Sequence, residues 1–164
     1  KDEKPLLDPS LVPQSHDEYP RRGAQIQNYR ICDKQGRAVN VLRRNEIYAF
    51  EYEVKFSENC EGVFFAMFIK TIQGAELGGS TTPPMSKRIE HIAAGTIHKL
   101  SFSFKCLLNS GVYFINAGVE KIEAEQSVFA HRIVDSTMFR VIPETGIAPT
   151  GIIDFQIDGK LTSP

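Results

Sequence analysis

Apolar and polar positions alternate along most of the chain after residue 24. The clearest case is "IYAFEYEVKF" at 47–56, in which every second residue from Tyr48 onward is a large apolar or aromatic residue. Side chains of a strand point alternately to its two faces, so this pattern predicts a strand with one buried face and one wet face. "KLSFSFKC" at 99–106 repeats the pattern. No segment shows the period of an amphipathic helix.

The remaining elements have the length and spacing of an all-β domain. Further strands are predicted at "GVFFAMFIK" (62–70), "GVYFINAGV" (111–119), "STMFRVI" (136–142) and "GIIDFQID" (151–158). Turn residues separate them at "DKQG" (33–36), "IQG" (72–74), "GG" (78–79) and "NSG" (109–111). This spacing predicts an immunoglobulin-like antiparallel β-sandwich of roughly seven to nine strands. The chain has no Trp and therefore lacks the Cys…Trp…Cys signature of antibody domains.

The first residues differ in composition from the rest. Residues 1–23 hold four of the nine prolines and many charges, which predicts a linker or arm before a single β-sandwich domain at 24–164. The chain opens at Lys1 without Met, which favours a fragment excised from a longer protein.

Charge and cysteine usage exclude several classes of function. Nineteen Lys and Arg against twenty Asp and Glu leave no basic field for nucleic acid, so no nucleic-acid partner is expected. Neither a membrane-spanning run nor a signal peptide is recognisable. Cys32, Cys60 and Cys106 are odd in number and widely spaced, which predicts free thiols in a reducing, cytoplasmic compartment.

Enzymatic motifs are missing. The sequence has no phosphate-binding loop, no GxGxxG, no GxSxG and no HExxH, and its histidines lack metal-ligand spacing, so we expect no catalytic residue, no metal and no cofactor. His131 and Asp135 are a candidate acid–base pair. The candidate is weak, because a solvated histidine in a loop and an aspartate that forms a turn account for the two residues without any catalytic role. Glu51 and Glu53 are the carboxylates that a sugar-cleaving enzyme would need, yet they fit the wet face of a strand.

The strand at 62–70 is unusual because both of its faces are apolar. Val63, Phe65, Met67 and Ile69 form its predicted core face, which leaves Phe64 and Phe68 on the outer face. The strand at 111–119, its expected neighbour, likewise turns Phe114 outward. Burial of one Phe is worth about 1.5–3 kcal/mol, so such a patch is expected to be covered. A ligand, a partner subunit or a folded-back arm are the three possible covers.

Flat aromatic rings beside amide and basic side chains have the chemistry of a carbohydrate site, since a sugar ring presents apolar C–H faces and a rim of hydroxyls. We therefore predict a non-catalytic glycan-binding face. Its residues are Phe64, Phe68, Phe114 and Asn116, with Lys70, His131 and Arg140 at the rim. The alternative is a dimerisation or interaction module without glycan affinity, in which the outer Phe residues are subunit interface. "GGSTTPP" at 78–84 is a weaker candidate for a loop that touches the ligand.

A succession of spaced motifs resembles a known family, the C-terminal carbohydrate-binding domain of Wzt-type proteins, which are ATP-binding subunits of ABC transporters that export O-antigen polysaccharide. The motifs are "ICDKQGR", "NEIYAFEYEVKF", "FFAMFIKTIQGAELGGSTT", "HKLSFSF", "LLNSGVYFINAGV", "VDSTMFRV" and "GIIDF". The similarity spans roughly residues 24–158. Family members commonly have Gly where Ala66 stands, and their sugar-contacting positions vary, so no binding site is transferred from them.

The resemblance implies a homodimer of immunoglobulin-like sandwiches that exchange a C-terminal strand, here "GIIDF". It implies recognition of O-antigen polysaccharide on its undecaprenyl-diphosphate carrier, often at a modified non-reducing end, so that finished chains are selected for export. It also implies a parent protein with an ATPase half before residue 1, contact with the transporter's membrane subunit through that parent, and a cytoplasmic location at the inner face of the inner membrane.

Overall fold

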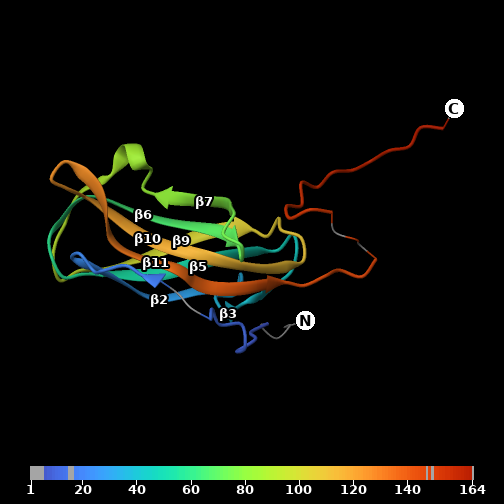
Figure 1. Ribbon diagram of the computed structural model, residues 1–164, viewed down its shortest axis with the longest axis horizontal. Helices are drawn as coiled ribbons and strands as arrows, with labels where there is room; N and C mark the ends of the chain where they lie inside the picture. The colour runs from blue at the N-terminus through green and yellow to red at the C-terminus, as the bar shows by residue number, and fades with distance from the viewer. Residues whose placement is uncertain (1–5, 15–16, 147, 149, 164) are drawn as a thin grey trace.

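Two β-sheets packed face to face make up the protein (Figure 1). The computed structural model describes residues 6–14, 17–146, 148 and 150–163. Sheet A follows the order β1 (Asp17–Glu18), β11 (Gln126–Val141), β10 (Gly111–Glu123), β6 (Cys60–Thr71) and β7 (Glu76–Thr82), with β4 (Val41–Leu42) beside β11 and β8 (Ile89–Ile92) beside β6. Sheet B follows the order β3 (Ala38–Val39), β2 (Ala24–Cys32), β5 (Ile47–Phe56) and β9 (Ile97–Lys105).

Nearly all strand pairs are antiparallel, and the short β4–β11 pair is parallel. The one helical element among the described residues is the 3-10 turn η1 (Met85–Lys87). This architecture confirms the all-β sandwich that the alternating pattern predicts.

The core lies between the two sheets and is built from the residues that the alternation turns inward. Strand β5 has the predicted bounds, and its Tyr48, Phe50, Tyr52, Val54 and Phe56 are all buried. Across the sandwich, β6 and β10 contribute buried residues at every second position, namely Val63, Phe65 and Met67 on β6 and Tyr113, Ile115, Ala117 and Val119 on β10. The cysteines Cys32, Cys60 and Cys106 are buried and free.

One hydrogen-bonding residue ties the core to the strands of sheet A. The Tyr52 hydroxyl lies 3.0 Å from the carbonyl oxygens of both Ala66 and Gly118, which pair across β6 and β10. Burial of this hydroxyl raises the pKa of Tyr52. Tyr52 therefore fastens sheet B to the centre of sheet A, because loss of these partners would leave a buried polar group unpaired and would lower the stability of the fold.

The structure corrects three sequence expectations. Strand β11 begins at Gln126, ten residues before the predicted start at Ser136. The predicted turn at 78–79 lies inside β7, since Gly79 allows β7 to run close against β6. The predicted strand at 151–158 is reduced to one isolated bridge, Leu108 with Ile153.

The described part of the predicted arm follows the sandwich. The Leu6 carbonyl accepts backbone hydrogen bonds from Asn40 and Val41, at 3.1 and 3.2 Å, and β1 pairs with β11. Residues 150–154 run beside the end of β9, where Asp154 N donates to the Leu107 carbonyl at 2.7 Å. Beyond this anchor the C-terminal tail leaves the body of the sandwich (Figure 1).

Candidate functional site

The outer face of sheet A carries most of the residues that the sequence nominates for binding. Antiparallel partners share a face, and the register pairs Phe68 with Asn116 and Lys70 with Phe114. Phe68 and Phe114 are therefore diagonal neighbours on adjacent strands, and both rings are half-buried. The structure brings together these four residues, Phe68, Lys70, Phe114 and Asn116, in the middle of the face.

A β-bulge shapes this centre. Between Ile115 and Ala117 the register of β10 with β11 shifts, and Asp135 sits in the extra length of β11 with φ of 57°. The Asn116 side-chain oxygen accepts a hydrogen bond from the Asp135 N–H at 2.8 Å, which stabilises the bulge. A non-glycine residue in the left-handed region is costly, and bulges often re-aim side chains at functional sites. Here the bulge directs the Asp135 carboxylate onto the outer face.

The directed carboxylate pairs with Lys70. Lys70 Nζ lies 2.6 Å from Asp135 Oδ1, and both side chains are largely shielded from water. The pair spans from β6 to β11 across Asn116 on the intervening strand. Lys70 is consequently held by an acid of its own chain, and its ammonium group is less open to a ligand than the sequence suggests.

Phe64 shares the outer face but is covered by the chain itself. Its side chain is 1% exposed, and the Arg88 guanidinium lies over its ring at 4.5 Å from the centroid. Arg88 is fixed there because it donates to the Gly62 carbonyl at 3.1 Å and to Ser127 Oγ at 2.9 Å. One part of the outward aromatic patch is thus closed by the segment that follows η1, which corrects the expectation that Phe64 is open to a ligand.

Arg132 is a further polar group on this face that the sequence analysis missed. It pairs with Gly118 on β10, and its guanidinium carbon lies 4.9 Å from the ring centroid of Phe129, 5.3 Å from Tyr19 and 5.9 Å from Phe68. Its Nη1 donates to the Tyr19 hydroxyl at 3.1 Å. Arg132 was missed because residues 126–135 were not recognised as strand. The alternation of Arg132 with buried His131 and Ile133 is the signal that would have found it.

Two glycines of sheet A lie where a Cβ would meet neighbouring atoms. A Cβ on Gly79 would clash with the carbonyl oxygen of Met67 and with Cβ of Phe68, so only glycine lets β7 approach β6 this closely. A Cβ on Gly118 would lie 3.4 Å from the Phe129 ring and 4.0 Å from Arg132. The Phe129 ring and Arg132 therefore lie directly over the buried backbone of Gly118.

The other two predicted rim residues lie elsewhere. His131 pairs with Val119, faces the interior and is fully buried, with Nδ1 accepting the Ile26 N–H at 2.8 Å and Nε2 lying 2.9 Å from Glu18 Oε1. Burial lowers the pKa of His131, although the Glu18 partner opposes this shift. Its predicted place at the rim is wrong because β11 begins earlier and its side-chain parity turns His131 inward. Arg140 does reach the outer face, but it pairs with Val112 at the far end from Phe64.

The weak catalytic candidates are not assembled. Buried His131 faces the core, whereas Asp135 pairs with Lys70 on the outer face, so they cannot act as one acid–base pair. Glu51 lies 3.4 Å from Arg30, and Glu53 accepts hydrogen bonds from Gln27 and Asn28, as expected of a wet strand face. Within the described residues no group of three or more His, Cys, Asp or Glu side chains could hold a metal ion.

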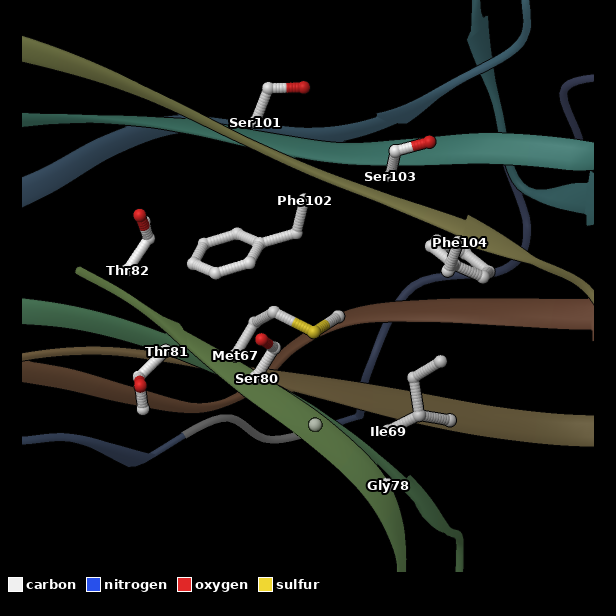
Figure 2. A pocket seen from close by; sticks show the side chains of 11 residues that line it. Met67, Ile69, Gly78, Ser80, Thr81, Thr82, Ser101, Phe102, Ser103 and Phe104 are labelled. Carbon is white, nitrogen blue, oxygen red and sulfur yellow. The ribbon is translucent and has the colours of Figure 1, made fainter. Parts of the chain in front are cut away.

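A second feature is a cleft at the open edge of the sandwich, between β7 and β9. Its volume is about 500 Å³, and Met67, Phe102 and Phe104 line it together with the backbone of Gly78 and the hydroxyls of β7 (Figure 2). The "GGSTT" segment thus borders this edge cleft as well as the outer face. A smaller cleft of about 180 Å³ continues beside Ile69, Leu77 and the anchored Ile153.

Comparisons with known proteins agree with the β-sandwich fold. The Wzt C-terminal domain family matches residues 15–155 of the sequence. The chain belongs to the Wzt C-terminal domain family. The crystal structure of a C-terminal domain of Wzt superposes with a TM-score of 0.78 at 23% sequence identity, covering 97% of this chain and 93% of that one.

More distant structures add little. The CARDB domain of a Pyrococcus furiosus protein, solved in solution, aligns with a TM-score of 0.43 at 16% identity, covering 74% of this chain and 96% of that chain. No curated protein sequence matches the chain significantly. The described residues contain no helix that could span a membrane. Membership of the Wzt family supports a carbohydrate-binding role in an ABC transporter for this non-catalytic domain.

Proposed function

We propose that this Wzt C-terminal domain recognises O-antigen polysaccharide on the outer face of sheet A and selects it for export. The observation that carries the proposal is the pairing of Phe68 with Asn116 and of Lys70 with Phe114, which places two rings and an amide side by side. Aromatic rings give a sugar ring an apolar surface, and the Asn116 amide, which is 3% exposed and accepts the Asp135 N–H, fixes the shape of the surface beside the rings.

The wider context of the proposal comes from the family. The ligand is the polysaccharide on its undecaprenyl-diphosphate carrier, and the feature that is read is a modification at the non-reducing end. The domain acts as part of an ABC transporter ATP-binding subunit, which contacts the membrane subunit in the cytoplasm at the inner face of the inner membrane. Arg140 and Lys70 remain rim candidates on the same face, and the domain itself needs neither a cofactor nor a metal.

The test is calorimetric titration of the purified chain with polysaccharide from the source organism. Chains that keep their terminal modification are compared with chains that lack it. We expect binding to the modified chains alone. A folded protein that binds neither form would contradict the proposal and would make the outer Phe residues an interface between subunits.

A specific observation also favours dimerisation. Residues 150–154 are anchored, with Asp154 2.6 Å from Arg44, whereas Phe155 and Ile157 beyond them are 74% and 87% exposed. An exposed apolar tail that follows Ile153, a residue lining the smaller edge cleft, is the arrangement expected of strand exchange between two copies. The homodimer we propose therefore inserts each tail at the β7–β9 edge of its partner.

Solution mass tests this dimer. Phe155→Ser with Ile157→Ser is expected to shift light-scattering mass from dimer to monomer at micromolar concentration. The matched control, Asp158→Ser with Lys160→Ser, changes two exposed polar residues of the same tail and is expected to leave the dimer intact. If both double variants and the natural chain have the same mass, strand exchange through this tail is wrong.

A further inference from the structure

Arg132, like Arg88, contacts aromatic rings and has no acidic partner among the described residues. Most of the other arginines pair with an acid of the same chain, including Arg21 with Glu18, Arg30 with Glu51, Arg37 with Asp33 and Arg44 with Asp154. Arg132 has no ion pair within the described residues, and its one side-chain hydrogen bond there is the 3.1 Å contact of Nη1 with the Tyr19 hydroxyl. The remaining N–H groups of its guanidinium are left for another acceptor.

Aromatic rings hold this guanidinium in place. Phe129 and Phe68 from the sheet and Tyr19 from the arm lie within 4.9–5.9 Å of its central carbon. A cation–π contact attracts the positive charge without using the in-plane N–H donors. The side chain is therefore ordered before any ligand arrives, which lowers the entropy cost of binding.

Its location links Arg132 to the proposed glycan face. Phe68 is shared, since its ring contacts Arg132 and its backbone pairs with Asn116. Gly118, opposite Arg132, adds no side chain that would separate the two. A sugar stacked on Phe68 would therefore bring its substituents next to the guanidinium.

We propose that Arg132 binds an anionic substituent, a carboxylate or a phosphate, on the glycan that occupies this face. The planar fork of guanidinium donors matches both groups and forms short, charge-assisted hydrogen bonds with them. Acids of the same face have partners already, because Asp135 pairs with Lys70 and Glu120 accepts the Ser127 hydroxyl at 3.0 Å. This inference rests on the proposed function and adds to it the class of ligand, an acidic polysaccharide.

The competing explanation is that Arg132 only fastens the arm through Tyr19. Three variants separate the two roles. Arg132→Gln removes the charge and the fork, Arg132→Lys keeps the charge alone, and Tyr19→Phe removes the hydroxyl contact but keeps the ring. Thermal unfolding of each variant shows whether the fold and the arm are retained.

The probe is polysaccharide from the source organism in three forms: untreated, carboxyl-reduced and dephosphorylated. We expect the untreated form to bind the natural chain. Removal of the acidic group that Arg132 contacts should weaken binding about tenfold or more, which corresponds to the loss of one hydrogen bond to a charged group. The form that loses affinity identifies whether that group is a carboxylate or a phosphate. Arg132→Gln is expected to bind the untreated form with affinity reduced by the same factor. Its affinity for the form that lacks the acidic group should equal that of the natural chain. Arg132→Lys should lie between, and Tyr19→Phe should bind within about twofold of the natural chain.

Each remaining outcome decides against a specific claim. Equal binding of the natural chain to all three forms overturns the anionic ligand while leaving glycan binding intact. A loss on Arg132→Gln that is the same for every form assigns Arg132 a structural role. Absence of binding to every form contradicts the proposed function, and the role of Arg132 fails with it.

Discussion

The outer faces of the two sheets differ in the side chains that they present to solvent. On sheet B the face is polar, with Ser101 and Ser103 on β9 and an ion pair of Arg30 with Glu51 at 3.4 Å. On sheet A the face carries aromatic rings, and two arginines lie over rings, Arg88 over Phe64 and Arg132 over Phe129.

The difference shows what the fold does not require. Sheet B proves that this sandwich is compatible with an ordinary solvated face made of alternating polar residues. The outer rings of sheet A and the close approach at Gly79 are additional to that need. Features that cost stability and cluster on one face are typical of a binding surface.

The largest expected effect is on stability, and it differs between the inner and outer faces of strand β6. Phe65→Ala is expected to lower the free energy of unfolding by about 3–5 kcal/mol, because the removed ring leaves a core cavity. Phe68→Ala should cost clearly less, since its ring is half-buried on the outer face, and should remove glycan binding. Urea unfolding measures the first quantity and calorimetry the second.

Lys55→Ala, at an exposed position on β5 of sheet B, is the control and should change neither quantity. Equal destabilisation by Phe65→Ala and Phe68→Ala, with binding intact in both, would contradict the assignment of Phe68 to a functional face.

Neighbouring glycines on β7 provide the next comparison. Gly79→Ala is expected to cost about 1–3 kcal/mol, because its Cβ would clash with the Met67 carbonyl and with Phe68 and would push β7 away from β6. A Cβ on Gly78 meets no atom within 4 Å, so Gly78→Ala should be nearly neutral. Thermal unfolding compares the two variants, and equal melting temperatures would show that β7 tolerates the displacement.

Much of the fold follows from local pattern. The alternation of apolar and polar residues at 47–56 predicts every buried side chain of β5. One face of this strand packs on the core regardless of which strands pair with it. The pairing of β6 with β10 was expected too, and the register confirms it. Within the described residues of the single chain the tail has one bridge, at Ile153, so the exchanged strand that its apolar alternation predicts stays a prediction.

The candidate face was less predictable because long-range contacts decide it. Phe64 has the outward parity that the sequence indicates, but Arg88, 24 positions later, closes it. His131 and Arg132 were misjudged or missed because the start of β11 sets which of the two points outward. The periodicity of one strand does not show which distant residue covers a side chain or at which residue a neighbouring strand begins.

The Lys70–Asp135 pair ranks third in expected effect. Lys70→Met leaves a shielded carboxylate without its partner, so we expect a loss of about 1–2 kcal/mol in the free energy of unfolding. Asp135→Asn keeps a residue type that tolerates the positive φ of 57°. In a double-mutant cycle measured by urea unfolding, the Lys70→Met, Asp135→Asn protein should lose less than the sum of the single losses. Additive losses would show that the two charges do not stabilise each other.

The smallest expected effect concerns pH and the contact of the arm with the interior. Burial lowers the pKa of His131 below its ordinary value of 6.5, and the hydrogen bond from Arg21 lowers the pKa of Glu18 below 4.5. Below pH 6.5 the unfolded chain therefore binds more protons than the folded one. Stability that is complete above this pH should decline as the pH falls, first through His131 and later through Glu18.

Glutamine at position 131 separates this titration from the rest of the protein. In His131→Gln the side-chain oxygen can accept the Ile26 N–H and the amide can donate to Glu18, so the contacts of the neutral histidine are kept without a titrating group. Melting temperatures at pH 7.5, 6.5 and 5.5 should fall less in His131→Gln than in the natural chain. The same fall in both would assign the acid sensitivity to other carboxylates. A smaller fall would show that sheet A contacts its arm through a neutral, buried imidazole, whereas the Arg30–Glu51 ion pair of sheet B lies at the surface.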